Sequence, residues 1–450
     1  MKRILFILAG LFILVGVANA KDEKYNADGD LIKTGWNLGP LPVVAFDADR
    51  GFQYGALLNL YNFGDGSNYP NPNETWYFEA SAYTGGTSKF IVNYDNKYLM
   101  PGVRLSVCTS FSNEKALDFY GFNGYQSIYD PSLSAYLFDS TEKGDKFAAD
   151  LKDNGVYPNG FYRLGRRRLN AKVDLTGEIN KNLFWEAGYT FNYIKISDFV
   201  PEGYSVVDGS LYSLYKMWGI IPEDQAGGGI VSALKAGLMY DSRNVENNPT
   251  RGIWAEAHFI AAPKFIGTTH GFAKINATFR HYVPLVPERL TFAYRLAYQG
   301  FLGDAPWYML PFYNNMGIQP DREAIGGYRT VRGIMLNRVQ GLHSGFFNAE
   351  LRWRFIDFTL FNQNIAFALS GFCDGAQVFK GYDISNKTGL APLTYNKYVN
   401  IDVKDSLHAA AGVGLRFIMN QNFIVAAEYA RSFNAQDGKG AFYLNTGFLF

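Results

Sequence analysis

The chain has 450 residues, and its 42 Lys and Arg nearly balance its 41 Asp and Glu, for a formal net charge of +1. This balance gives no support to nucleic-acid binding, which requires a basic surface. Aromatic residues make up 17% of the chain and Gly contributes 47 residues, a mixture of strand formers and turn formers that indicates a large all-β protein.

The first 20 residues have the pattern of a secretory signal peptide. Lys2 and Arg3 supply positive charge, an apolar run covers 4–17, and the run 18–20 (Ala-Asn-Ala) matches a small-x-small cleavage site. We expect 1–20 to be removed, 21–39 to form a short periplasmic segment, and 40–450 to form one membrane domain. After the signal, no apolar stretch reaches 18 residues, so the sequence predicts no membrane-spanning helix.

The rest of the chain repeats one pattern, an alternating segment of about ten residues followed by a turn or loop. In 347–355, Phe, Ala, Leu, Trp and Phe occupy one face, while Asn, Glu, Arg and Arg occupy the other. Side chains alternate across a strand, so such a segment has one apolar and one polar face. Charges on the polar faces and aromatic residues near the segment ends favour a transmembrane barrel over a soluble sandwich.

Sixteen segments follow this pattern: 41–47, 51–62, 75–84, 87–97, 103–113, 166–179, 183–196, 230–241, 253–261, 271–283, 289–300, 343–355, 364–378, 406–418, 422–432 and 440–450. Short connections such as 180–182 follow even-numbered segments, whereas the long ones (114–165, 197–229, 301–342 and 379–405) follow odd-numbered segments. The layout predicts an all-β fold, a transmembrane antiparallel β-barrel of about 16 strands in a Gram-negative-type outer membrane, with short periplasmic turns and long outer loops.

The last segment predicts a strand that runs to the end of the chain. Phe442, Leu444, Thr446, Phe448 and Phe450 alternate on one face of it. A terminal aromatic residue on an amphipathic strand is similar to the recognition signal of outer-membrane barrels. Phe448 and Phe450 are therefore candidates for a C-terminal barrel signal.

Four stretches carry a likeness to a known family. They are the opening hairpin 40–55, the run 240–252 (Tyr-Asp-Ser-Arg, then Asn-Pro-Thr-Arg-Gly), the run 331–334 (Val-Arg-Gly-Ile), and the run 372–379 (Phe-Cys-Asp-Gly-Ala-Gln-Val-Phe). In this order they resemble the barrel domain of the BamA/TamA superfamily, also called the bacterial surface antigen family. The resemblance covers 40–450 and implies a role in outer-membrane protein assembly, or in transport across or into the outer membrane.

The resemblance also implies a lumenal clamp. The long loop after the eleventh segment folds into the barrel, where Arg332 pairs with Glu350 and Asp374, and Gly333 permits a tight turn. A guanidinium bridges carboxylates with a fixed, bidentate geometry that Lys cannot copy. We expect this clamp to be a structural brace and not a catalytic site.

Some positions depart from the family pattern. Ile334 replaces the usual aromatic residue, and Ala376 replaces the usual Gly. Family insertases also carry periplasmic POTRA modules before the barrel, and residues 21–39 are too few for one module. We therefore expect a POTRA-less member, which places the insertase role in question.

The chain has few signs of chemistry. No Gly-x-Ser-x-Gly elbow and no phosphate-binding loop is present. No pair with metal-ligand spacing occurs among the five His residues, which are His258, His270, His281, His343 and His408. We expect no enzyme activity, no cofactor and no metal, and we expect Cys108 and Cys373 to be free thiols.

The barrel ends suggest a mechanism. Pro40 and Pro42 remove backbone donors from the first segment, and Gly447 weakens the last. Such a seam can open and pair with an incoming strand, although these residues can equally serve only to shape the barrel end. The expected partners are outer-membrane lipid, unfolded barrel proteins and a separate periplasmic or lipoprotein partner. The alternative functions are a small or gated pore, and a surface-interaction barrel that uses the long loops.

Overall fold

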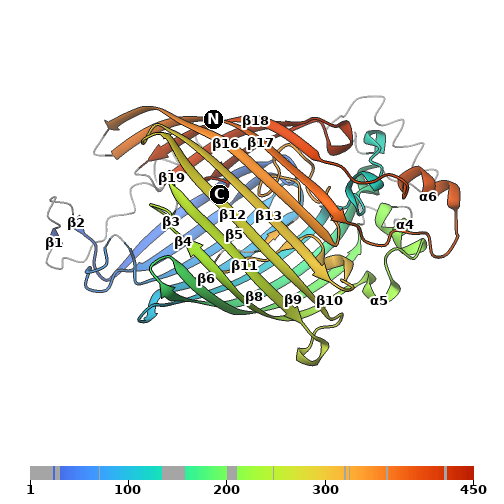
Figure 1. Ribbon diagram of the computed structural model, residues 1–450, viewed down its shortest axis with the longest axis horizontal. Coiled ribbons are helices and arrows are strands. Elements are labelled where there is room, and N and C mark those ends of the chain that lie inside the picture. Colours follow the sequence, from blue (N-terminus) through green and yellow to red (C-terminus); the bar gives the residue numbers. More distant parts are fainter. Residues whose placement is uncertain are drawn as a thin grey trace.

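Sixteen antiparallel strands close into one barrel in the computed structural model of the chain (Figure 1). The structure describes residues 24–25, 31–69, 71–133, 158–199, 210–246, 248–318, 321–323, 325–360, 363–419 and 423–450. The predicted signal peptide, residues 1–20, lies outside the described residues. The barrel strands are β3 (Trp36–Asp47), β4 (Gly51–Asn62), β5 (Glu74–Tyr83), β6 (Thr87–Met100), β7 (Val103–Asp118), β8 (Arg163–Asn180), β9 (Leu183–Asp198), β10 (Gly228–Asp241), β11 (Gly252–Ala262), β12 (Phe272–Val286), β13 (Leu290–Leu302), β16 (His343–Leu360), β17 (Gln363–Lys380), β18 (His408–Met419), β19 (Phe423–Ser432) and β20 (Ala441–Thr446).

Each of the sixteen predicted segments corresponds to one of these strands, so the predicted barrel and its strand number are confirmed. Neighbours around the barrel follow chain order, and β20 pairs with β3 to close it. The first strand begins at Trp36, four residues before the predicted boundary at Pro40. Two further pairs of short strands are not part of the barrel wall. They are β1 (Lys24–Tyr25) with β2 (Leu31–Ile32), and β14 (Phe312–Tyr313) with β15 (Arg322–Glu323).

The prediction for the last strand is wrong at its end. β20 stops at Thr446, and Gly447 has φ +86°, a left-handed conformation that favours glycine and turns the chain out of the sheet. Phe448 and Phe450 therefore do not continue the alternation. Phe450 is buried instead, within the lumen beside Tyr282 and Ala293.

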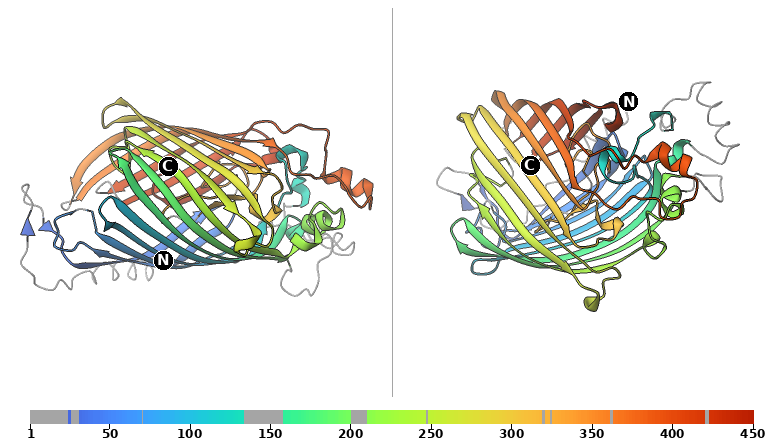
Figure 2. Two further views of the ribbon diagram at one scale, coloured as in Figure 1. Left: turned by 60° about the horizontal axis from the view of Figure 1, so that its bottom comes forward. Right: turned by 45° about the vertical axis from the view of Figure 1, so that its right-hand side comes forward.

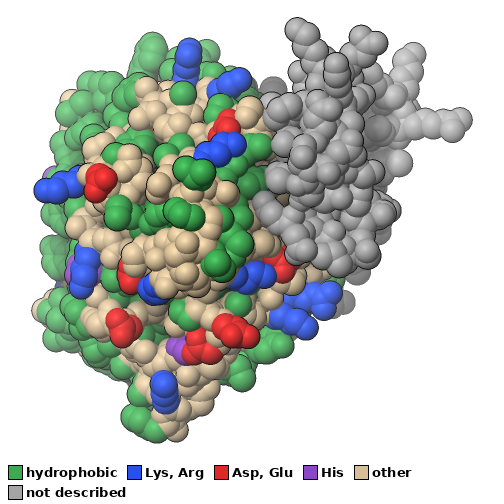
Figure 3. Space-filling model, turned by 90° about the vertical axis from the view of Figure 1, so that its right-hand side faces the viewer, with side chains coloured by type: hydrophobic (Ala, Val, Ile, Leu, Met, Phe, Trp, Pro, Cys, Tyr) green, Lys and Arg blue, Asp and Glu red, His purple; other side chains and the backbone are tan. Residues whose placement is uncertain are grey.

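The strand pattern separates two surfaces. In β18, Ala410 and Arg416 are buried in the lumen, while Val413 and Leu415 are exposed at 64% and 47% on the outside. Many large apolar side chains from the other strands are exposed on the same outer surface. Seen from the end that carries the long loops, hydrophobic side chains lie along the flank, whereas charges of both signs are scattered over the loop face (Figure 3).

The described parts of the long loops form a cap at one end of the barrel (Figures 1 and 2). It holds the short helices α3 (Pro158–Phe161), α4 (Leu211–Met217), α5 (Glu223–Ala226) and α6 (Pro392–Tyr398), with one-turn helices at 124–126, 131–133, 264–266, 307–309 and 435–437. A large cluster of buried aromatic side chains holds the cap together, including Phe119, Phe122, Tyr215, Trp218 and Trp307. None of the helices in the described ranges is long and apolar enough to cross a membrane.

Candidate functional site

The described part of the loop between β13 and β16 (303–318, 321–323 and 325–342) enters the lumen and is held there by the barrel wall. We call it the lumenal loop. Wall side chains donate hydrogen bonds to its backbone carbonyls: Gln299 Nε2 to Leu310 O at 2.7 Å, and Lys274 Nζ to Phe312 O at 2.6 Å. These bonds satisfy loop carbonyls that are removed from water, and so fix the path of the loop.

A first anchor of the lumenal loop joins it to β8. The loop carboxylate of Asp321 lies 3.4 Å from Arg168 Nη2 and 3.7 Å from Lys172 Nζ, and all three side chains are buried. Burial opposes the charge of Asp321, but Lys172 and Arg168 hold its pKa below the ordinary value. An acidic loop residue thus meets a basic wall.

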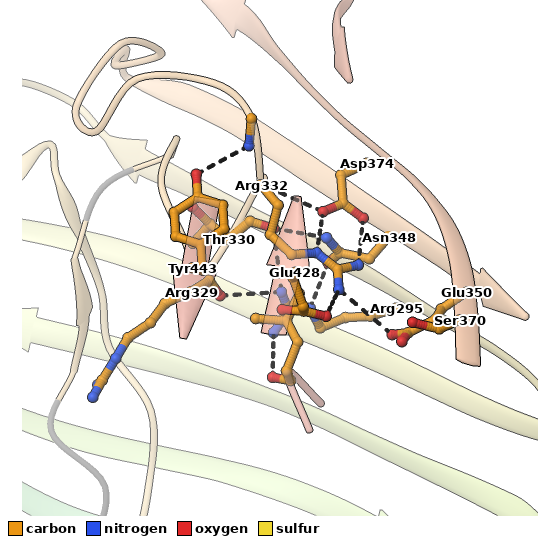
Figure 4. Close-up of polar contacts among 12 residues, drawn as sticks. Arg295, Arg329, Thr330, Arg332, Asn348, Glu350, Ser370, Asp374, Glu428 and Tyr443 are labelled. Carbon is orange, nitrogen blue, oxygen red and sulfur yellow. Dashed lines mark hydrogen bonds and ion pairs between the residues drawn. The ribbon is translucent and has the colours of Figure 1, made fainter. Parts of the chain in front are cut away.

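The second anchor has the opposite polarity and contains the predicted clamp residues (Figure 4). Arg332 Nε and Nη2 donate to the two carboxylate oxygens of Asp374 at 2.8 and 3.1 Å, and its Nη1 donates to Glu428 Oε1 at 2.7 Å. Glu350 lies farther away, with Oε2 at 3.8 Å from Nη1. The structure therefore brings the four predicted clamp residues together, and adds Glu428 as a closer partner than Glu350.

The wall beneath Arg332 is shaped to receive it. Its guanidinium carbon lies 3.4 Å from the centre of the Phe372 ring, which gives a cation–π contact. Across the strands Phe372 is opposite Gly412, and Gly412 is opposite Ala430. These small residues leave space for the loop. A side chain at Gly333, whose φ is +84°, would lie 2.8 Å from Ala430 Cβ. Only glycine fits this position without strain.

A second layer of charges surrounds the clamp. Arg416 Nη2 lies 2.6 Å from Glu350 Oε1 and 2.7 Å from Glu428 Oε1, and Arg352 Nη2 lies 3.4 Å from Glu350 Oε2. Three guanidinium groups thus face three carboxylates, from Glu350, Asp374 and Glu428, in a buried network over β16–β19. Burial opposes the charge of Arg332, but the three carboxylates raise its pKa above the ordinary value.

Sequence reasoning placed Arg352 on a polar face but did not include it, Arg416 or Glu428 in the clamp. The alternation along β19 is the signal that could have placed Glu428 in the lumen. Ala426 and Ala430, two residues before and two residues after it, lie on the lumenal face, so Glu428 lies on that face as well. Which charges meet depends on strand register, and spacing along the chain does not give it.

The seam between β20 and β3 has fewer paired residues than the other pairs of neighbouring strands in the barrel. It joins only two residue pairs, Tyr443 with Asp47 and Leu444 with Phe46. On its other side β3 pairs with β4 along its whole length, from Trp36 to Asp47. The segment of β3 from 36 to 45 therefore presents an edge without a partner strand in the described part of the chain.

This free edge lacks two donors. Phe52 on β4 directs both its N–H and its carbonyl toward Thr84, so Phe46 opposite it directs its own groups toward the seam. The two-residue period of a strand gives Val44, Pro42 and Pro40 the same orientation. Because proline has no N–H, the edge keeps its carbonyl acceptors but loses donors at two consecutive seam-facing positions.

The lumenal loop reaches both sides of the seam. The Gly333 N–H donates to the Tyr443 hydroxyl on β20 at 3.1 Å, and the Tyr328 ring lies 5.6 Å from that of Tyr443. The Leu336 N–H donates to Asp49 Oδ1, in the β3–β4 turn, at 3.3 Å. The loop thus supports from inside the two strands that pair least with one another.

The chain end is also held inside. Arg352 Nη2 donates to Phe450 O at 3.0 Å, and the guanidinium carbons of Arg352 and Arg295 lie 5.0 and 5.1 Å from the Phe450 ring centre. The carboxyl end of the chain lies within the barrel outline in each view (Figures 1 and 2). Cys108 and Cys373 are free.

Comparisons with known proteins agree with this architecture. The family model described as the Omp85 superfamily domain matches residues 102–450. Among solved structures, BamA from Haemophilus ducreyi lacking POTRA domains 1–3 is similar with a TM-score of 0.54 and 15% identity, covering 99% of this chain and 78% of that one. CdiB from Acinetobacter baumannii follows with a TM-score of 0.45 and 12% identity, covering 93% of this chain and 61% of that one. No curated protein matches the sequence.

Proposed function

Because the chain belongs to the Omp85 superfamily, we propose that it assists the assembly of proteins into an outer membrane, or their transport across it, through the seam between β3 and β20. The observation that carries this proposal is the mismatch between the two edges of β3, which is fully paired with β4 and joined to β20 at only two residue pairs. An unpaired strand edge is a template for another strand.

The position of the two seam pairs indicates the end of the barrel from which an incoming strand would enter. Both seam pairs lie beside the β3–β4 turn, at the capped end of the barrel, and the edge is free toward the end with short turns. Separating the strands breaks few backbone hydrogen bonds, while the lumenal loop keeps β20 and the β3–β4 turn in place. An incoming strand would enter from the short-turn end, which we assign to the periplasmic side.

The prolines set a condition on the incoming strand. Opposite Pro40 and Pro42 it finds carbonyl acceptors but no donors, so pairing there is incomplete. Such an edge favours transient over permanent pairing, because fewer hydrogen bonds must break when the strand leaves. This suits a template that releases its product.

The apolar outer surface supports contact with outer-membrane lipid. The Arg332 network serves in this proposal as the brace that keeps the lumenal loop in place while the seam opens and closes. Unfolded barrel proteins are the proposed substrates, with a separate periplasmic or lipoprotein partner to deliver them. Phe448 and Phe450 remain proposed as a barrel recognition signal.

Photo-crosslinking in a Gram-negative host tests the proposal. A photoreactive residue at Val44, 48% exposed on β3, should capture precursors of outer-membrane proteins. The matched control is Val173 on β8, which is 43% exposed on the same outer surface but lies between fully paired strands. Capture of lipid alone at both positions, or of β20 alone at Val44, would contradict the proposal.

A pore is the second candidate, because the lumen carries charges of both signs, as a water-filled channel does. The lumenal loop and its two anchors lie across that interior, so a barrel in which the loop stays in place should conduct weakly. Planar-bilayer recording separates the two functions: large, steady conductance from the purified chain would favour the pore.

A further inference from the structure

A cluster of three buried side chains in the barrel wall is separate from both loop anchors. It consists of Glu186 on β9 and of Glu256 and His258 on β11, with 3%, 6% and 3% of their surface exposed. One ligand atom from each lies within 4.8 Å of the others. We infer that these three side chains form a binding site for one divalent metal ion of the Zn²⁺ type.

Strand register brings the residues together. Glu186 is opposite Gly237 on β10, and Gly237 is opposite His258, so the three share one row across three strands. Glu256 precedes His258 by two residues and projects from the same face. A side chain at Gly237 would have its Cβ 2.5 Å from the Cβ of His258. The glycine therefore leaves a space between the carboxylate of β9 and the imidazole of β11.

The hydrogen bonds of His258 indicate which nitrogen is free to bind a metal. Its Nε2 lies 3.2 Å from the carbonyl oxygen of Asn314 in the lumenal loop. A carbonyl only accepts, so Nε2 carries the proton and a neutral ring leaves the lone pair on Nδ1. Nδ1 faces Glu256 Oε1 at 3.1 Å without forming a hydrogen bond. Metal-bound histidines commonly donate their other N–H to a backbone carbonyl in this manner.

The second carboxylate strengthens the inference independently. Glu186 Oε2 is buried and has no hydrogen-bond partner among the described residues. The nearby ammonium of Lys235 is held by Asp174, with Nζ 2.6 Å from Oδ1. A buried carboxylate oxygen without a partner is costly, and a cation beside it removes that cost.

The distances suit a first-row metal. Tetrahedral ligands at about 2.0–2.2 Å from Zn²⁺ lie about 3.3–3.6 Å from one another. The contact of 3.1 Å between Nδ1 and Oε1 is about 0.2 Å shorter than this range, so a small outward shift of either side chain admits the ion. One imidazole and two carboxylates form a borderline ligand set, which favours Zn²⁺ over Mg²⁺ or Ca²⁺. Through the Asn314 carbonyl, a bound ion would tie the lumenal loop to β11.

Metal analysis of the full chain tests the inference. The barrel is folded in detergent, treated with EDTA, dialysed against Zn²⁺ and analysed for bound metal. We expect one Zn²⁺ per chain, and loss of that ion in Glu186→Gln and in His258→Gln. The control is His270→Gln, because His270 Nε2 also lies 3.1 Å from a carboxylate, that of Asp224, whose side chain is 71% exposed.

Two further readouts guard against a folding defect. Heat-modifiable gel mobility reports whether each variant closes, and Glu186→Gln should close because Glu186 Oε2 has no partner to lose. Co²⁺ substituted for Zn²⁺ should give a d–d absorption band that Glu186→Gln abolishes and His270→Gln retains. If Zn²⁺ does not bind, or binds equally to the closed Glu186→Gln variant, the inference fails. In that case protons, and not a metal ion, neutralise the carboxylates of the cluster.

Discussion

Two regions of the same barrel wall are built in opposite ways. From β16 to β19 the strands pair along their length, and a buried network of three Arg and three acidic side chains ties them to the lumenal loop. At the seam, β20 and β3 share two residue pairs. Backbone pairing and side-chain bracing are thus unevenly distributed around the wall, and one place in the closed barrel is left easy to open.

Removing the brace should have the largest effect on the barrel. Arg332→Met leaves Asp374 and Glu428 buried without their shared cation, and such a loss costs about 3–5 kcal/mol. We expect the free energy of unfolding in urea, measured in lipid vesicles, to fall by that amount. Arg332→Lys should recover only part of it, because Lys cannot form the bidentate pair.

The control lies in the same loop. The side chain of Arg329 is exposed, so Arg329→Met should change stability by no more than about 0.5 kcal/mol. Equal losses from the two substitutions would show that the network is not a specific brace.

The opposite intervention strengthens the seam. In a background without the two native cysteines, Phe46→Cys with Leu444→Cys places thiols on directly opposed residues. A disulfide there should stabilise the barrel by about 2–4 kcal/mol and should abolish substrate capture at Val44 until a reductant is added.

A second cysteine pair, Leu58→Cys with Phe78→Cys, joins β4 to β5 at another directly opposed pair. It should stabilise the barrel without affecting capture. Capture that continues with the seam oxidised would show that the strands need not separate.

A smaller effect is expected where the loop meets the seam. Tyr443→Phe removes the hydroxyl that accepts the Gly333 N–H, and an unsatisfied buried donor costs about 1–3 kcal/mol. Tyr429→Phe, on the exposed side of β19, is the control. Faster limited proteolysis of β20 in the Tyr443 variant alone would locate the loss at the seam, whereas equal rates in both variants would contradict the loop's role.

A further effect concerns pH. Burial, followed by the charges of Asp47 and Asp118, raises the pKa of Asp49 in the β3–β4 turn well above its ordinary value of 3.8. A raised folded-state pKa means that the protonated group stabilises the fold at low pH and that this contribution is lost as pH rises from about 4 through the folded-state pKa.

Asp49→Asn should therefore gain stability relative to the unchanged chain as pH increases from 4 to 8. Unfolding free energies across that range measure the gain, with the exposed Asp402→Asn as a control. A constant difference between Asp49→Asn and the unchanged chain would contradict the raised pKa.

Much of this structure could be predicted from the sequence, because a strand that separates lipid from a polar lumen needs a two-residue period. The lumenal position of Arg332 could be predicted because the run 331–334 resembles a family motif. The end of β20 was not, since Phe448 and Phe450 keep the alternation although Gly447 turns the chain inward. Glu428 was missed because its partners depend on register.

The cluster of Glu186, Glu256 and His258 shows the same limit. Along the chain only Glu256 and His258 are close, at a spacing of two, and this pattern is not one of the usual metal-ligand motifs. Glu186 joins them because β10 places Gly237 between the two strands. Spacing rules derived from helices and loops do not detect ligands that meet across a sheet.

The clamp also implies an order of events during folding. Arg332 meets Glu428 across 96 residues, whereas the seam joins Asp47 to Tyr443 and so encloses nearly the whole chain. Contacts between nearer segments form earlier on entropic grounds. We expect β16–β19 to gather around the loop while β3 is still distant, so that the barrel passes through a late intermediate whose interior is already packed and whose two end strands are the last to meet.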